Sequence, residues 1–214
     1  VRTWFKNKFK TFSDPQKYAV IPIHNQENVL VSAVTGSGKT LAFGSKILQN
    51  TKKGFGIQAL ILTPTRELAE QISKALNNFS KYNPLEIIPV YGGISINPQI
   101  KNLRHADVVI GTPGRILDHL SRRTIELKHL KTLVLDEADR MLDMGFITDV
   151  ERIIGQCPKT RQTLLFSATI SEDIVRLSKK YMTNQMEISA EEYVDQAKLI
   201  QIYYDIDDSL KYSM

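Results

Sequence analysis

A loop of small residues lies between an apolar segment and an amphipathic segment, and it limits the folds open to this chain. The loop residues are Ala33, Val34, Thr35, Gly36, Ser37, Gly38, Lys39 and Thr40. Small residues let successive backbone N–H groups converge on phosphate oxygens, a lysine adds positive charge, and a hydroxyl serves a metal ion. Residues 28–32 read as a short buried strand, and apolar residues at helical spacing predict a helix over 39–51. Strand, loop and helix stand in the order that phosphate binding requires.

The first position of the loop is Ala33 rather than the glycine of the strict pattern. Taken alone, the loop has a simpler interpretation as a glycine- and serine-rich turn with a surface lysine. The strand and helix patterns on its two sides favour phosphate binding, because a phosphate loop occurs in that context.

A second motif supplies negative charge to the same chemistry. Residues 131–135 read as an apolar strand and are followed by Asp136, Glu137, Ala138 and Asp139, which spell DEAD in one-letter code. At the carboxyl edge of a parallel sheet, Asp136 would lie beside the phosphate loop as a Mg²⁺ partner through water, and Glu137 would orient or deprotonate the attacking water. The alternative is a helix amino terminus at which acids stabilise the helix dipole.

The order of the elements predicts a single domain of the α/β class. Strands are predicted at 28–32, 59–62, 87–91, 108–110, 131–135 and 164–166. Helices are predicted at 39–51, 67–79, 115–120, 147–154 and 174–181. This alternation indicates a mostly parallel sheet with helices on both faces. A polar or glycine-containing segment follows each strand, so these segments should gather at one edge of the sheet.

The ordered set of motifs resembles the first RecA-like domain of the DEAD-box ATP-dependent RNA helicases, over nearly the whole chain. The resemblance implies a RecA-like P-loop NTPase fold, ATP and Mg²⁺ as cofactors, and RNA as partner. Nucleotide would be held by Thr35, Gly36, Ser37, Gly38, Lys39, Thr40 and Asp139, and Mg²⁺ by Thr40 and Asp136. Catalysis would involve Lys39, Asp136, Glu137, Ser167 and Thr169. Ser167 and Thr169 would couple nucleotide state to unwinding, with Asp139 holding that coupling network together.

The same resemblance implies a surface that grips the RNA backbone. Its residues would be Pro64, Thr65, Arg66, Gly92, Gly93, Thr112, Pro113, Gly114 and Arg115. Helix amino termini and glycine-rich turns present N–H groups to phosphates, and arginine adds charge-assisted contacts. Such contacts carry little base information, so we expect little sequence preference and a marked salt dependence. Taken singly, Arg66 has the alternative of an ion pair with Glu67 or Glu70, and the two glycines that of a plain turn.

The same resemblance implies that Gln16 recognises adenine. The family has a glutamine followed three residues later by a small residue and six later by proline, as in Gln16, Ala19 and Pro22. A glutamine amide accepts from the exocyclic N6 of adenine and donates to N7. Where the family has proline and threonine before this glutamine, the chain has Phe12 and Ser13, of which Ser13 keeps the hydroxyl.

Aromatic residues at the start of the chain have two interpretations. Trp4, Phe5, Phe9 and Phe12 are interspersed with lysines, and this segment is similar to the start of Lhr-type helicases, which implies a DNA helicase as an alternative. The rings would then stack on bases while the lysines hold phosphates. Spacings of three and four residues favour instead a helix that packs its aromatic face on the core.

The resemblance also predicts half of an enzyme. Residues 1–192 would form the first RecA-like domain, and residues 193–214 resemble the interdomain linker and the start of a second domain. The chain opens at Val1 rather than Met, which indicates a fragment. The second domain supplies an arginine finger, worth about 10³ to 10⁵ in rate in other nucleotide hydrolases. The chain alone should bind nucleotide weakly, hydrolyse it poorly and leave duplexes intact. A nucleotide-responsive module that clamps RNA without turnover is the second hypothesis, and the presence of Glu137 favours the enzyme.

Composition excludes several other classes of protein. The net charge of +5 permits a polyanionic partner. Cys157 is the one cysteine, which excludes an internal disulfide, suits a reducing compartment and is read as an inert residue. The four histidines show no metal-ligand spacing. The sequence has neither a membrane-spanning stretch nor the apolar core of a signal peptide, so we expect a soluble cytoplasmic protein without a membrane partner. We also expect a monomer.

Overall fold

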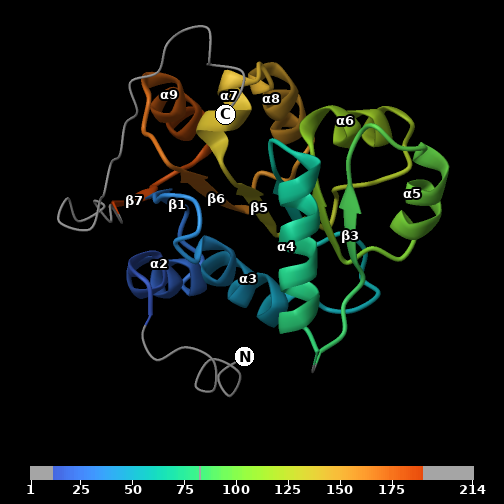
Figure 1. Ribbon diagram of the computed structural model, residues 1–214, viewed down its shortest axis with the longest axis horizontal. Helices are drawn as coiled ribbons and strands as arrows, with labels where there is room; N and C mark the ends of the chain where they lie inside the picture. The colour runs from blue at the N-terminus through green and yellow to red at the C-terminus, as the bar shows by residue number, and fades with distance from the viewer. Residues whose placement is uncertain (1–11, 82, 190–214) are drawn as a thin grey trace, which may run out of the picture.

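A parallel sheet lies between two layers of helices in the computed structural model, which describes residues 12–189 apart from residue 82 (Figure 1). The strands are β1 (Val29–Ser32), β2 (Ala59–Leu62), β3 (Ile87–Val90), β4 (Val108–Gly111), β5 (Thr132–Leu135), β6 (Gln162–Ser167) and β7 (Met186–Ser189). The helices are α2 (Asp14–His24), α3 (Lys39–Asn50), α4 (Arg66–Phe79), α5 (Ile96–Leu103), α6 (Pro113–Ser121), α7 (Ala138–Asp143), α8 (Ile147–Gly155) and α9 (Glu172–Tyr181). The predicted α/β class is therefore confirmed.

Seven strands form the sheet within the described residues, in the order β3-β4-β2-β5-β6-β1-β7. Every neighbouring pair is parallel, with β1 in register on β6 from Val29 opposite Leu164 to Ser32 opposite Ser167. Because all strands point the same way, the segments that follow them emerge at one edge, as predicted. We call this edge the carboxyl edge and the opposite one the amino edge.

Alternate residues of each strand face opposite helix layers. In β1, Val29 and Val31 belong to the core shared with α2, α3 and α4, whereas Leu30 belongs to the core shared with α5 through α9. In Figure 1 α2 and α3 lie below the sheet and α7, α8 and α9 above it. Both faces of the strands are therefore buried, which explains why the central strands read as continuous apolar runs rather than alternating ones.

Four elements were missing from the sequence prediction. Helix α2 contains Pro22, α5 contains Pro98, and α7 has six residues, so none shows a long helical apolar period. Strand β7 is an edge strand with mostly exposed side chains, and it carries no apolar run that would indicate a strand. Of the aromatic opening segment, only Phe12 falls among the described residues, where it is 53% exposed and not in a helix; Trp4, Phe5 and Phe9 lie outside them, as do residues 193–214.

No helix between residues 12 and 189 has the length and apolar character that crossing a bilayer demands.

Candidate nucleotide and RNA site

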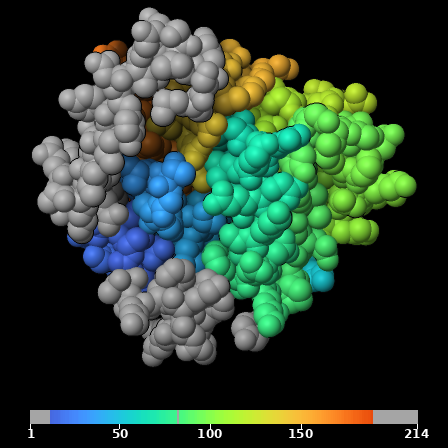
Figure 2. Space-filling view, in the orientation of Figure 1, coloured from blue at the N-terminus to red at the C-terminus, as the bar shows by residue number. Residues whose placement is uncertain are grey.

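Most of the predicted site segments meet at the carboxyl edge. The phosphate loop follows β1 and the acidic motif follows β5, and these two strands flank β6, which ends at Ser167. On this face of the molecule the light-blue segment after β1 reaches the surface between the turquoise α4 and the gold residues around α7 (Figure 2). Residues distant in sequence are thus brought together by strand order alone.

The phosphate loop needs its last glycine for two reasons. Gly38 has a φ of +85° as the residue that caps the amino end of α3, a left-handed conformation that favours glycine. A Cβ atom at Gly38 would also come within 2.4 Å of Gln16 Nε2 and 2.9 Å of Ser13 Oγ. Gly36 has a similar φ of +84°, but a Cβ there would meet nothing within 4 Å. The loop therefore packs on α2 at Gly38 and is open at Gly36.

Gln16 ties α2 to the phosphate loop. Its side chain is buried, with Nε2 donating to Gly38 O at 3.2 Å and Oε1 accepting from Ser13 N at 3.3 Å. Each amide atom keeps one further hydrogen-bonding position, since the amide has two donors and two acceptor lone pairs. Ser13 Oγ is buried and finds no hydrogen-bond partner among the described residues. The adenine-reading role predicted for Gln16 and Ser13 stays a prediction, and the structure adds a positioning contact.

Lys39 and Asp136 form a buried pair beneath the loop. Lys39 Nζ lies 3.8 Å from Asp136 Oδ1 and donates to Ala33 O at 3.2 Å. Burial raises the pKa of Asp136 to about 6, against the opposing effect of the Lys39 charge. The Glu137 N–H donates a hydrogen bond to the same oxygen, Asp136 Oδ1, at 3.1 Å. The buried Asp136 carboxylate has lost its water, and Lys39 and the Glu137 N–H only partly offset that loss. A cation that approaches this carboxylate would therefore be attracted to it.

Glu137 adopts the left-handed backbone conformation, with φ 52° and ψ 52°, where β5 gives way to α7. Its carboxylate accepts from Thr35 Oγ1 at 3.2 Å through Oε1 and from Arg140 Nη1 at 3.3 Å through Oε2. A non-glycine residue in this region costs of order 1–3 kcal/mol and is found mainly at functional positions. Arg140 was missing from the predicted site, although its spacing of three residues from Glu137 on a helix was a usable signal.

Asp139 connects the acidic motif to the segment after β6. Its Oδ2 accepts from Ala168 N at 3.1 Å and from both the backbone N and the hydroxyl of Thr169, at 2.9 and 3.0 Å, while Asp139 N donates to Ser167 Oγ at 3.2 Å. Burial works to raise the pKa of Asp139, but the hydrogen bonds from Thr169, Arg140 and Ser167 outweigh it and the pKa is lowered. Asp139 therefore contacts both Ser167 and Thr169 directly, and the coupling role predicted for these residues stays a prediction.

The segment after β2 begins α4 with an ordinary cap. Thr65 Oγ1 accepts from Leu68 N at 3.2 Å, and Pro64 is buried beside it. Arg66 is exposed, and its Nε donates to Glu67 Oε1 at 2.6 Å. The ion pair considered as an alternative for Arg66 is thus present with Glu67, whereas Glu70 accepts instead from the Tyr91 hydroxyl at 2.5 Å. An exposed pair of this kind is weak and leaves Arg66 available to a stronger anion.

The segments after β3 and β4 lie against each other. Gly92 and Gly93 are exposed, with a φ of +83° at Gly93, and Arg115 Nη2 donates to Ile94 O at 3.0 Å. Thr112 caps α6, with Pro113 in its first turn, and Gly114 is exposed on the same turn. Arg115 Nη1 is buried without a hydrogen-bond partner among the described residues. The structure therefore brings these two predicted RNA segments into contact with each other.

The oxygen donors of Asp136 and Thr40 fit a Mg²⁺ ion that binds together with nucleotide. Between residues 12 and 189 no group of three or more histidine, cysteine or carboxylate side chains converges as a metal site. Mg²⁺ usually keeps several waters and is bound through one or two carboxylates together with substrate phosphates. The desolvated Asp136 carboxylate and the Thr40 hydroxyl at the start of α3 match that requirement.

Comparisons with known proteins agree with this geometry. A family model described as DEAD/DEAH box helicase matches residues 13–177. The chain is 44% identical over 195 residues to a probable ATP-dependent RNA helicase of Methanocaldococcus jannaschii, a match that covers 90% of this chain and 52% of that protein. It is 50% identical over 178 residues to the ATP-dependent RNA helicase DeaD of Buchnera aphidicola, covering 81% of this chain and 30% of that protein.

Solved structures show the same architecture. A DEAD box protein from Methanococcus jannaschii superposes with a TM-score of 0.86 at 46% identity, covering 88% of this chain and 53% of that one. A hypothetical ATP-dependent RNA helicase from Sulfolobus tokodaii gives a TM-score of 0.80 at 39% identity, covering 88% and 55%. The chain spans about half the length of these proteins or less.

Proposed function

The chain belongs to the DEAD/DEAH box helicase family, and from that premise we propose that it is the ATP-binding and catalytic half of an ATP-dependent RNA helicase. The observation that carries the proposal is the joining of three motifs at one edge of the sheet. Thr35 of the phosphate loop bonds Glu137, and Asp139 of the same acidic motif bonds Thr169. These contacts would therefore serve both ATP hydrolysis and its coupling to unwinding.

In the proposed mechanism the loop N–H groups and Lys39 bind the phosphates of ATP. Lys39 would exchange its bond to Ala33 O for phosphate oxygens, and Gln16 would use its remaining donor and acceptor positions on adenine. Thr40 and Asp136 would hold Mg²⁺, which neutralises charge on the phosphates when bound. Family membership supports ATP binding, and the individual roles rest on the contacts described above.

Glu137 is the proposed orienting residue or base for the attacking water. The hydrogen bonds from Thr35 and Arg140 hold its carboxylate in place. A base of this kind contributes about 10²- to 10⁴-fold in rate. Because Thr35 belongs to the phosphate loop, nucleotide bound there would directly affect the position of Glu137.

RNA is the proposed partner at the carboxyl edge, held at its backbone by the segments after β2, β3 and β4. Arg66 would supply positive charge, and the amino termini of α4 and α6 would direct N–H groups at phosphates. We expect little sequence preference. A second RecA-like domain would complete the active site from outside this chain, and the linker assignment for residues 193–214 belongs to the same proposal.

The experiment that tests the proposal is Mg²⁺-dependent ATP turnover by the chain, with and without single-stranded RNA. Glu137→Gln serves as the blank for contaminating ATPases. Binding of ATP with turnover near the blank in both conditions supports a catalytic half that needs a second domain. RNA-stimulated turnover well above the blank, or strand separation by the purified chain, would show that the chain completes its own site and would contradict the half-enzyme proposal. Failure to bind ATP would overturn the assignment altogether.

A further inference from the structure

Two hollows lie side by side at the amino edge of the sheet, opposite the proposed catalytic site. The first, which we call the Phe55 hollow, is about 530 Å³ and is lined by residues 54–57, 103–106 and 123–129 apart from His105 and Leu127. The second, which we call the lysine hollow, is about 500 Å³ and includes Lys52 and residues 130–132 and 160–162 in its lining. The loops before β2 and β5 line both hollows, so the two form one continuous surface.

Positive charge dominates this surface. The lysine hollow has Lys46, Lys52, Lys131 and Arg161 in its lining and no carboxylate among its described lining residues. In the Phe55 hollow, Glu126 is the one acid and pairs with Lys128 at 2.6 Å, whereas Arg104 and Arg123 have no ion-pair partner in the described part of the chain. Arg161 Nε is buried with no hydrogen-bond partner there either. A surface of this composition favours a polyanion.

Phe55 is held out from the protein by a loop with several internal hydrogen bonds. It is 65% exposed between Gly54 and Gly56, which have φ values of +80° and +75°. Buried Asp107 accepts from Gly54 N at 2.7 Å. Buried Gln58 also bonds across this loop, to the N–H and carbonyl of Lys52 and to Gly56 O. An exposed aromatic ring on a loop fixed in this way is preorganised for contact with a partner.

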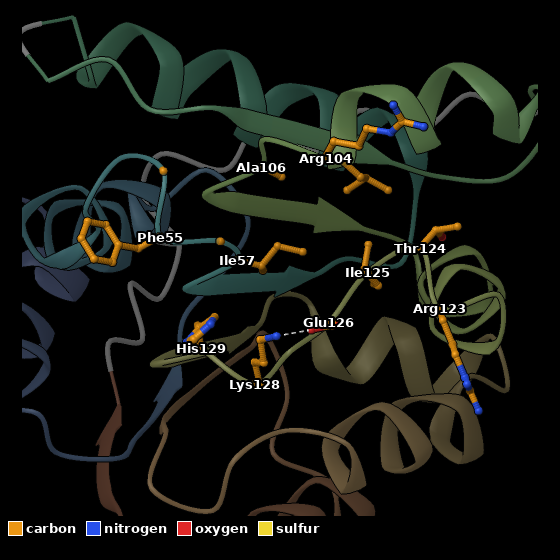
Figure 3. A pocket seen from close by; sticks show the side chains of 13 residues that line it. Phe55, Ile57, Arg104, Ala106, Arg123, Thr124, Ile125, Glu126, Lys128 and His129 are labelled. Atoms are coloured by element: carbon orange, nitrogen blue, oxygen red, sulfur yellow. Dashed lines mark ion pairs between the residues drawn. The ribbon is translucent and has the colours of Figure 1, made fainter.

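The close view shows how these groups are distributed (Figure 3). Ile57 and Ile125 lie in the floor, with Phe55 and His129 toward one end and Arg104 and Arg123 toward the other. An aromatic platform at the edge of a cationic groove is the arrangement by which proteins bind single-stranded nucleic acid, with bases on the ring and phosphates on the cations. Ile57 and Ile125 in the floor are each only 5% exposed, which disfavours an apolar peptide segment as the ligand.

We infer that the amino edge is a second binding surface for single-stranded RNA, separate from the carboxyl edge. A base stacks on Phe55, and Lys52, Lys131 and Arg161 hold backbone phosphates. The inference rests on the proposed function only in taking RNA as the nucleic acid. A strand that occupies both edges would be longer than one that fits the carboxyl edge alone, so the second surface contributes to affinity for long RNA.

Fluorescence anisotropy of labelled oligouridine tests this, with strands of about 20 and about 6 nucleotides at fixed salt. The full chain is compared with Phe55→Ala, with Phe55→Tyr, and with Lys52→Glu combined with Lys131→Glu. The control combines Lys101→Glu and Lys179→Glu, which make the same change in net charge at exposed positions outside both hollows. Arg66→Glu tests the carboxyl edge separately.

We expect Phe55→Ala and the Lys52/Lys131 pair each to weaken binding of the long strand by about fivefold or more. Phe55→Tyr and the control pair should bind within about twofold of the parent chain, because the tyrosine ring also stacks and the control lysines lie outside both hollows.

Loss of RNA binding with Arg66→Glu alone, while the amino-edge variants bind like the parent chain, would overturn this inference and leave the proposed function standing. If the amino-edge variants lose RNA binding and Arg66→Glu does not, the result supports this inference and contradicts the proposed RNA site at the carboxyl edge. If polyglutamate of equal charge displaces the RNA and Phe55→Ala has no effect, the surface binds polyanions in general and the RNA inference is wrong.

Discussion

Thr35 donates a hydrogen bond to Glu137 over 3.2 Å, although the two residues are 102 positions apart in the chain. The bond joins the phosphate loop to the acidic motif without an intervening ligand. It means that a change at Glu137 is felt at the loop, and that catalytic loss must be separated from loss of binding.

In a longer chain that includes the proposed second RecA-like domain, Glu137→Gln should abolish ATP turnover while keeping ATP binding. The amide preserves the shape of the side chain and its acceptor oxygen, but it is neither an anion nor a base, so a loss of about 10²- to 10⁴-fold is expected. Turnover and the binding of a fluorescent ATP analogue are measured on the same preparations. Unchanged turnover would remove Glu137 from the mechanism.

Gly38→Ala should destabilise the protein and weaken nucleotide binding, whereas Gly36→Ala should have the smaller effect. Both positions have the same positive φ, so both substitutions carry a backbone cost of about 1–2 kcal/mol. Only at Gly38 would the new methyl group meet Gln16 and Ser13. Urea unfolding and nucleotide titration of the two variants measure the cost of that contact, and equal effects would show that Gln16 moves aside freely.

Asp139 and Thr169 should be energetically coupled. The carboxylate accepts from both the hydroxyl and the N–H of Thr169, and hydrogen bonds to charged groups contribute about 1.5–3 kcal/mol each. Thr169 is exposed, so we expect a coupling free energy of about 1 kcal/mol between Asp139→Asn and Thr169→Val. A double-mutant cycle of urea unfolding gives this value. Additive effects would mean that the hydroxyl contact does not form in solution.

Stability should fall above pH 9 through the thiol of Cys157. Burial raises the pKa of this thiol to about 11, and its Sγ–H donates to Ile153 O. At pH values between the unfolded and folded pKa, the folded state binds the proton and the unfolded state loses it, so the free energy of unfolding decreases as pH rises. The full loss is about 2–3 kcal/mol by pH 11.

Cys157→Ala supplies the control for that pH dependence. The variant loses some packing at every pH, but its unfolding free energy should fall less steeply between pH 9 and 11 than that of the parent chain. Denaturant titrations at several pH values compare the two slopes. Parallel slopes would show that the thiol titrates normally, as would rapid reaction of the folded protein with a thiol reagent at pH 8.

The sequence predicted those parts of the fold in which local pattern and motif agree. The phosphate loop and α3 are an example, because the glycines and the apolar spacing after Lys39 point to the same local structure. Helix α2 was missed because Pro15 and Pro22 conceal it, and its stability comes from packing Ala19 and Ile23 on the sheet. Residue pairs at the site, such as Gln16 with Gly38, depend on how helices sit against loops, which no spacing within the sequence specifies.

The bond from Lys39 to the carbonyl of Ala33 spans six residues and closes the phosphate loop into a ring. The Ala33 carbonyl thus takes the place that a phosphate oxygen would occupy beside Lys39. An incoming phosphate group has to displace this carbonyl from the lysine. Binding is an exchange of one acceptor for another, so its net free energy is the difference between two bonds rather than the whole of one. The same contact holds the ends of the loop together in the structure without a ligand, so the loop shape does not depend on a bound phosphate.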